Sequence, residues 1–173
     1  MTLTRNIPLL KFIKKWDVFS LNRSVKKNWP VYWALGARIK NTSNDRRKFE
    51  VLLPFNSKTR GYFGTHFGGA LFAFVDPIHV FAISLNLGSD YMVWDTSSEI
   101  KFLKAASEDV VAEIKINQKE INTIKEQCRL NKKSTRDYRI DIKTVSGKLV
   151  ATVFKSVYIR IKNPNLERKM RST

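Results

Sequence analysis

The chain has 173 residues, a length typical of one domain with a sizeable core. Hydrophobic residues make up 43% of it, which excludes a disordered chain. Its single cysteine and two histidines exclude a disulfide framework and a thiolate metal cluster, and zinc would need several carboxylates as well. We therefore expect no metal and a reducing, cytoplasmic compartment.

The net charge of +17 is confined to the two flanks of the chain. Residues 1–48 and 111–173 each carry a net +10, whereas residues 49–110 carry a net −3. Such flanks suit a nucleic acid, an anionic membrane surface, a phosphate-bearing ligand or simply a solvated surface. We expect no specific nucleic-acid binding, because the strand aromatics fall mostly on the apolar faces and not among basic residues on an open face.

Residues 7–20 are predicted to form an amphipathic helix. Leucine, isoleucine and aromatic residues recur there at helical spacing, with lysines mainly on the other side. The helix suits either a membrane surface or packing on the chain's own sheet, and we favour packing. The predicted organisation is an N-terminal helix over residues 1–24 that packs on the domain, a folded domain over 25–162 and a loose tail over 163–173.

The rest of the chain alternates between apolar and polar residues in short runs, with one long exception. The alternating runs predict antiparallel strands with one wet face, and 121–128 predicts a short amphipathic helix. The predicted strands cover residues 33–41, 47–53, 94–103, 112–117, 138–143 and 148–162.

The exception is the segment 68–87, which is apolar all round and long enough to cross a membrane. Asp76, Pro77 and His79 lie near its middle. A charged Asp at a bilayer centre is costly, so we predict a buried core helix and no transmembrane span.

The order of these elements and the stretch from Gly64 to Pro77 resemble the hotdog superfamily, which implies an α+β fold. In that fold a curved antiparallel sheet of about six strands wraps one long helix. The closest likeness is to a little-characterised branch described as tetrameric acyl-CoA thioesterases. It extends over residues 90–95, 102–105 and 153–160, so it covers about residues 28–162.

The same stretch also resembles thioesterases of the phenylacetate-degradation type, in which an Asp follows a Gly-Gly pair by seven residues. The resemblance implies that Asp76 is the general base or nucleophile. Gly68 and Gly69 begin the helix, where free backbone N–H groups could stabilise an oxyanion. The alternative reading is structural: the glycines serve the turn, and Asp76 stabilises a kink at Pro77. Burial is expected to raise the pKa of Asp76, and His79, three residues on, is placed to hydrogen-bond it.

Six further residues are candidate substrate contacts. His79 is one, and His66 is another. In thioesterases of the phenylacetate type a His directly precedes the two glycines, whereas here Phe67 has that position and His66 lies one residue earlier. The remaining four are Thr65, which could donate a hydroxyl, Asn56, which could orient water, and Arg60 and Lys104, which could meet phosphates.

The resemblance also implies the partners. We expect an acyl-CoA or acyl-carrier-protein thioester as substrate, no cofactor beyond the coenzyme A of the substrate, and a homodimer or homotetramer with sites at the subunit junction. The main alternative is a hotdog protein that binds acyl ligands without turnover.

Overall fold

The computed structural model describes residues 16–163. Most of the predicted helix at 7–20 lies outside this range, as does nearly all of the predicted tail. Within it, Asp17 accepts a hydrogen bond from the Ser20 backbone N–H and caps a different helix, α2 (Val18–Asn28).

The first predicted strand is wrong over its first half. Pro30 begins a short helix, α3 (Pro30–Ala34), because proline suits the first helical turn. Gly36 then adopts a φ of +76°, a turn conformation that favours glycine, and β1 starts only at Arg38. The apolar residues at 33 and 35 therefore belong to the helix and the turn.

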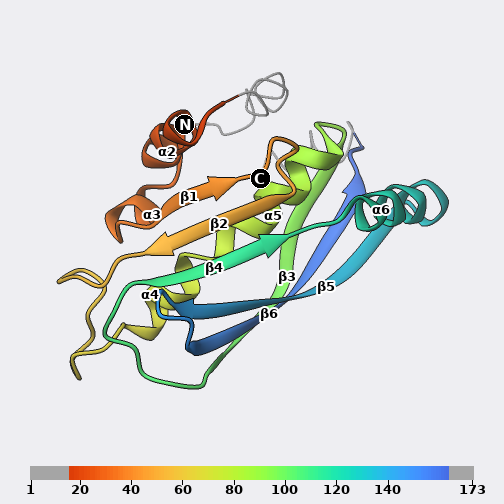
Figure 1. The fold of residues 1–173 in the computed structure, drawn as a ribbon. Helices are drawn as coiled ribbons and strands as arrows, with labels where there is room; N and C mark the ends of the chain where they lie inside the picture. Colours follow the sequence, from red (N-terminus) through yellow and green to blue (C-terminus); the bar gives the residue numbers. More distant parts are fainter. Residues whose placement is uncertain (1–15, 164–173) are drawn as a thin grey trace, which may run out of the picture.

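The remaining elements match the predicted types and order. In the described part of the chain, six strands form one antiparallel sheet in the order β1-β2-β4-β5-β6-β3, and Figure 1 shows its curvature. The strands are β1 (Arg38–Thr42), β2 (Lys48–Leu53), β3 (Tyr91–Phe102), β4 (Val110–Lys115), β5 (Lys133–Thr144) and β6 (Leu149–Ile161).

Helix α2 covers the β1 edge of this sheet. The Asn22 side chain accepts from the Ile39 N–H at 2.9 Å and donates to the Ile39 carbonyl at 2.8 Å. The amide therefore pairs with β1 as a neighbouring strand would. Since an unpaired edge invites association, α2 protects this side, while β3 at the opposite edge has β6 as its only strand partner in the described sheet.

The central helix fills the curve of the sheet, as predicted, but it is divided in two. α4 (Gly68–Ala73) and α5 (Asp76–Leu87) follow each other across one face of the sheet (Figure 1). Pro77 lacks the N–H that would bond the Ala73 carbonyl, so the helix breaks between them. Phe74, Ile78 and Ile83 are fully buried in the core that helix and sheet share. The segment is long and apolar enough to cross a membrane, but here it packs against the sheet.

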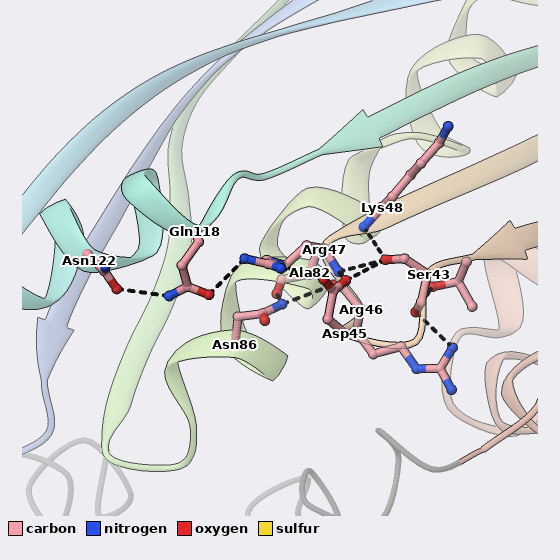
Figure 2. A network of polar contacts seen from close by, with 10 residues as sticks. Ser43, Asp45, Arg46, Arg47, Lys48, Ala82, Asn86, Gln118 and Asn122 are labelled. Atoms are coloured by element: carbon pink, nitrogen blue, oxygen red, sulfur yellow. Dashed lines mark hydrogen bonds and ion pairs between the residues drawn. The ribbon is translucent and has the colours of Figure 1, made fainter.

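A polar network fixes the far end of the central helix (Figure 2). The Asn86 side chain donates to the carbonyls of Arg46 and Ala82, both at 2.9 Å. Next to it, Arg47 donates to Gln118 at 2.7 Å, the first residue of α6 (Gln118–Asn131). The turn between β1 and β2 is thereby tied to both α5 and α6.

Candidate functional site

Asp76 lies at the helix break and is the first residue of α5. A carboxylate in the first turn lies at the positive end of the helix dipole, a favourable place for a negative charge. Its side chain is 49% exposed. The burial expected from the sequence is therefore absent, because the break brings this residue to the protein surface.

Lys155 of β6 forms a hydrogen bond and an ion pair with Asp76. Its side chain is fully buried, and its ammonium lies 2.7 Å from the Asp76 carbonyl oxygen and 3.0 Å from Asp76 Oδ1. The same ammonium lies 2.6 Å from Oδ2 of Asp95 on β3. One buried cation thus connects the helix to an inner strand and an edge strand.

Asp95 is the more enclosed of the two carboxylates, at 22% exposure. Its Oδ1 is buried and has no hydrogen-bond partner among the described residues. Burial raises the pKa of Asp95 and the charge of Asp76 adds to this, whereas Lys155 opposes both effects. The β3–β6 register shifts between Asp95 and Ser97, and such bulges re-aim side chains beside functional sites.

A cavity of about 370 Å³ opens beside the two carboxylates. Apart from Ser84, the remaining walls are aromatic or aliphatic, so the space suits an apolar group lying next to a carboxylate. Its lining residues are Trp29, Asp76, Pro77, Val80, Phe81, Ser84, Val93, Trp94 and Asp95. A larger hollow of about 560 Å³ lies along α6, but only that one helix lines it.

Gly68 and Gly69 begin α4, and their N–H groups precede the helix's first intrahelical bond, from Ala70 N to the Phe67 carbonyl. Aromatic rings occupy the space beside both glycines. A Cβ on Gly68 would lie 2.8 Å from the Phe102 ring, and one on Gly69 would lie 2.5 Å from the Phe67 ring. Close packing therefore accounts for part of the requirement for glycine here.

His79 makes no contact with Asp76 of the expected kind. It is buried, neither ring nitrogen has a hydrogen-bond partner among the described residues, and its ring lies 4.0 Å from that of Tyr138 between centroids. Burial lowers the pKa of His79 to about 3, and the charge of Lys155 adds to the effect. The expected hydrogen bond is wrong, because Lys155 occupies the place beside Asp76.

His66 anchors its loop to the segment between β3 and β4. Its Nε2 lies 2.9 Å from the Glu108 carbonyl, and its backbone N–H donates to Ala106. Burial lowers the pKa of this imidazole. The ring also packs edge-on against Phe55. These contacts give His66 a structural role.

The four other predicted substrate contacts lie around the start of α4, away from Asp76. Asn56 accepts from the Lys58 N–H and so stabilises its own turn, and Thr65 accepts from Gly61 through its backbone carbonyl. Arg60 is exposed above the Phe55 ring. Lys104 is exposed just after β3. None of the four forms a hydrogen bond or ion pair with Asp76 or Asp95 in the described structure.

Comparison with known proteins places the chain in a family. The model of DUF4442, a domain of unknown function, matches residues 19–159. The chain belongs to the DUF4442 family. No curated protein matches it.

Solved structures show that this DUF4442 chain has the hotdog fold. PA5026 from Pseudomonas aeruginosa, described as a protein of unknown function and probable thioesterase, is 16% identical with a TM-score of 0.73 over 83% of this chain and 96% of that one. Thioesterase HI1161 from Haemophilus influenzae is 20% identical with a TM-score of 0.64, over 84% and 92%. A mutant of thioesterase PA1618 from Pseudomonas aeruginosa is 18% identical with a TM-score of 0.65, over 85% and 96%.

Sequence reasoning missed Lys155 and Asp95 in this DUF4442 chain. A signal for Lys155 existed: it alternates in register with Val153 and Val157, both buried, so the strand pattern places a lysine on the inward face. A charged residue at a core position requires a partner. That requirement points back to the one carboxylate of the apolar helix.

Proposed function

We propose that the protein hydrolyses acyl-CoA thioesters, with Asp76 as general base or nucleophile. The observation that carries the proposal is the half-exposed Asp76 carboxylate, oriented by Lys155 at the wall of an apolar cavity of about 370 Å³. The acyl group would lie in that cavity with its carbonyl carbon next to Asp76. Structural likeness to hotdog proteins described as thioesterases supports this choice.

In the general-base form of the reaction, Asp76 removes a proton from a water molecule as the water attacks the thioester carbonyl. The carbonyl oxygen gains the negative charge, for which the Gly68 and Gly69 N–H groups are the proposed donors. Collapse of the tetrahedral intermediate breaks the carbon–sulfur bond and releases the coenzyme A thiolate. In the nucleophilic form, the Asp76 carboxylate attacks the thioester carbonyl carbon, the carbon–sulfur bond breaks and the coenzyme A thiolate leaves. Water then hydrolyses the resulting mixed anhydride to the free acid and the Asp76 carboxylate.

These groups cannot serve one thioester within one chain. Seven or eight residues separate Asp76 from the two glycines, roughly 11 Å along a helix. A base must lie about 3 Å from the proton it abstracts, and oxyanion donors a similar distance from the oxygen. We therefore propose a homodimer in which Asp76 of one subunit works with the helix start of the other.

The free edge of β3 is the proposed dimer contact. It is twelve residues long, it carries Asp95, and it lies opposite the edge that α2 covers. Pairing of two such edges would join the two sheets side by side. The exposed Arg60 and Lys104 near the helix start are the proposed contacts of the coenzyme A phosphates.

Thiol release from a panel of short, long and aryl acyl-CoAs tests the proposal. Asp76→Asn and Asp76→Ala are expected to fold and to lose about 10²–10⁴-fold in kcat, the usual contribution of a general base. Asp90→Asn, at an exposed carboxylate outside the site, is the matched control. Full activity in both Asp76 variants would overturn the proposal.

The alternative is an acyl-CoA-binding protein without turnover. The rings beside Gly68 and Gly69 favour it, since they fill space through which a carbonyl could approach the backbone. It predicts that wild type binds acyl-CoA and that no member of the panel releases thiol.

A further inference from the structure

Lys155 is unusual for a residue of an inner strand. Its side chain is fully buried between the inward-facing Val153 and Val157, on the strand that lies between β5 and β3. An ammonium has three donors, and here each has an acceptor: the Asp76 carbonyl, Asp76 Oδ1 and Asp95 Oδ2. One buried nitrogen thus lies within 3.0 Å of three oxygen atoms from two other elements.

Stability alone gives little reason for this arrangement. Replacing a buried ion pair with apolar residues of similar volume is often neutral or stabilising, because burying charges costs more than their attraction returns. A methionine would fill the same space between two valines. The lysine instead connects two carboxylates, and one of these lines the cavity half-exposed.

Few charged or titratable groups lie near Asp76 in the described structure. Lys155 approaches from β6 and Asp95 from β3, and on α5 itself His79 is neutral at pH 7 because its pKa is about 3. Behind His79, the Tyr138 hydroxyl and Arg136 of β5 both bond Glu120 of α6, at 3.0 Å and 2.7 Å. These groups form a neighbouring cluster in which the cation and the carboxylate offset each other. The balance at Asp76 therefore depends on Lys155 and Asp95.

We propose that Lys155 is a positioning residue that holds the Asp76 carboxylate in place and offsets its negative charge, and that Asp95 regulates it by competing for the same ammonium. The inference rests on the proposed function for its catalytic meaning. An ionised Asp95 draws the lysine charge toward β3 and repels Asp76. A protonated Asp95 leaves the lysine charge to Asp76 alone. The two residues thus act on Asp76 with opposite sign.

The test compares Lys155→Met and Asp95→Asn with wild type in the pH dependence of kcat and KM. Loss of the cation is expected to move the acid limb of kcat to higher pH, by about 1–3 units, the usual effect of a close opposite charge. Loss of the competing carboxylate is expected to move it to lower pH. KM should change far less than kcat. Damage to the fold alone would not shift the two limbs in opposite directions.

Lys48→Met is the matched control, because it removes an exposed ion pair, the 2.6 Å contact with Glu113 on the same sheet. It should leave the acid limb in place. Limbs that move in the same direction, or do not move, would overturn the inference. If Lys155→Met fails to fold, Asp95→Asn still decides, because it leaves the contact between Lys155 and Asp76 intact.

A second readout does not depend on turnover. Carbon-13 NMR of aspartate carboxyls, assigned through Asp76→Asn and Asp95→Asn, follows their titration directly. Lys155→Met should raise the titration midpoint of Asp76, and Asp95→Asn should lower it. If wild type hydrolyses nothing and these shifts occur, the proposed function fails and the control of Asp76 by Lys155 stands. If the shifts are absent, the inference fails whatever the activity.

Discussion

The two ends of the central helix are built differently. At the C-terminal end, Asn86 bonds the β1–β2 turn, which Arg47 connects in turn to α6 (Figure 2). The apolar side chains of this end are buried. The N-terminal end begins with two glycines, and Tyr62, Phe63 and Phe67 nearby are 97%, 89% and 59% exposed. The C-terminal end is thus fixed by polar contacts as well as by burial, whereas the N-terminal end combines buried residues of α4, Ala70 and Leu71, with exposed aromatic side chains beside them.

The sharpest way to break this comparison is to truncate one side chain at each end. Ile83→Ala removes a fully buried side chain from the C-terminal half and should cost about 2–5 kcal/mol of unfolding free energy. Phe63→Ala, at an 89% exposed position, should cost less than about 0.5 kcal/mol. Denaturant unfolding measures both, and similar losses would show that the exposed aromatic end also carries stability.

His79, between the two ends, gives a pH-dependent effect of intermediate size. Its folded-state pKa is about 3 against an ordinary 6.5, so below pH 6.5 the unfolded state binds a proton that the folded state does not. Stability should therefore fall with pH between 6.5 and 3, by about 1.4 kcal/mol per unit. His79→Phe keeps a ring against Tyr138 and should remove about 2–3 kcal/mol of the loss between pH 6.5 and 4.5. Parallel curves for the two proteins would contradict this.

The smallest expected effect sharpens the role of the polar network. Asn86→Ala removes hydrogen bonds to Arg46 and Ala82 and should cost about 1–2 kcal/mol. Asn122→Ala, which removes an exposed contact at the rim of the same network, should cost less than about 0.5 kcal/mol. Thermal unfolding measures the loss of stability in both variants. A larger loss in Asn86→Ala than in Asn122→Ala shows that the network anchors the helix, and equal small losses show that it does not.

Much of the fold could be predicted because burial alternates along the chain. The strands carry an apolar period of two and the central helix a continuous apolar run, and both signals depend on neighbouring residues alone. The interpretation failed around residues 33–37, which belong to the short helix that begins at Pro30 and to the turn at Gly36. Alternation over a few residues does not distinguish such a segment from a strand.

The candidate site divides in the same way. Asp76 could be identified because a carboxylate in an apolar run is conspicuous within a few residues of sequence. The strand pattern places Lys155 on the inward face, but its contact with Asp76, 79 residues away, depends on where β6 falls in the sheet. His79 showed the opposite failure. Spacing along the helix suggested a contact with Asp76, while the tertiary structure turned the ring toward Tyr138.

The strand order has a consequence for how the molecule is made. β6 is the last strand among residues 16–163, yet it lies inside the sheet between β5 and β3. During synthesis on a ribosome, β3 has no strand partner until residues 149–161 have emerged. Until then, part of the apolar surface of the central helix stays exposed. Folding of the sheet is thus delayed until nearly the whole domain has been synthesised. During that interval the unpaired strand and the exposed apolar surface are the features that chaperones bind.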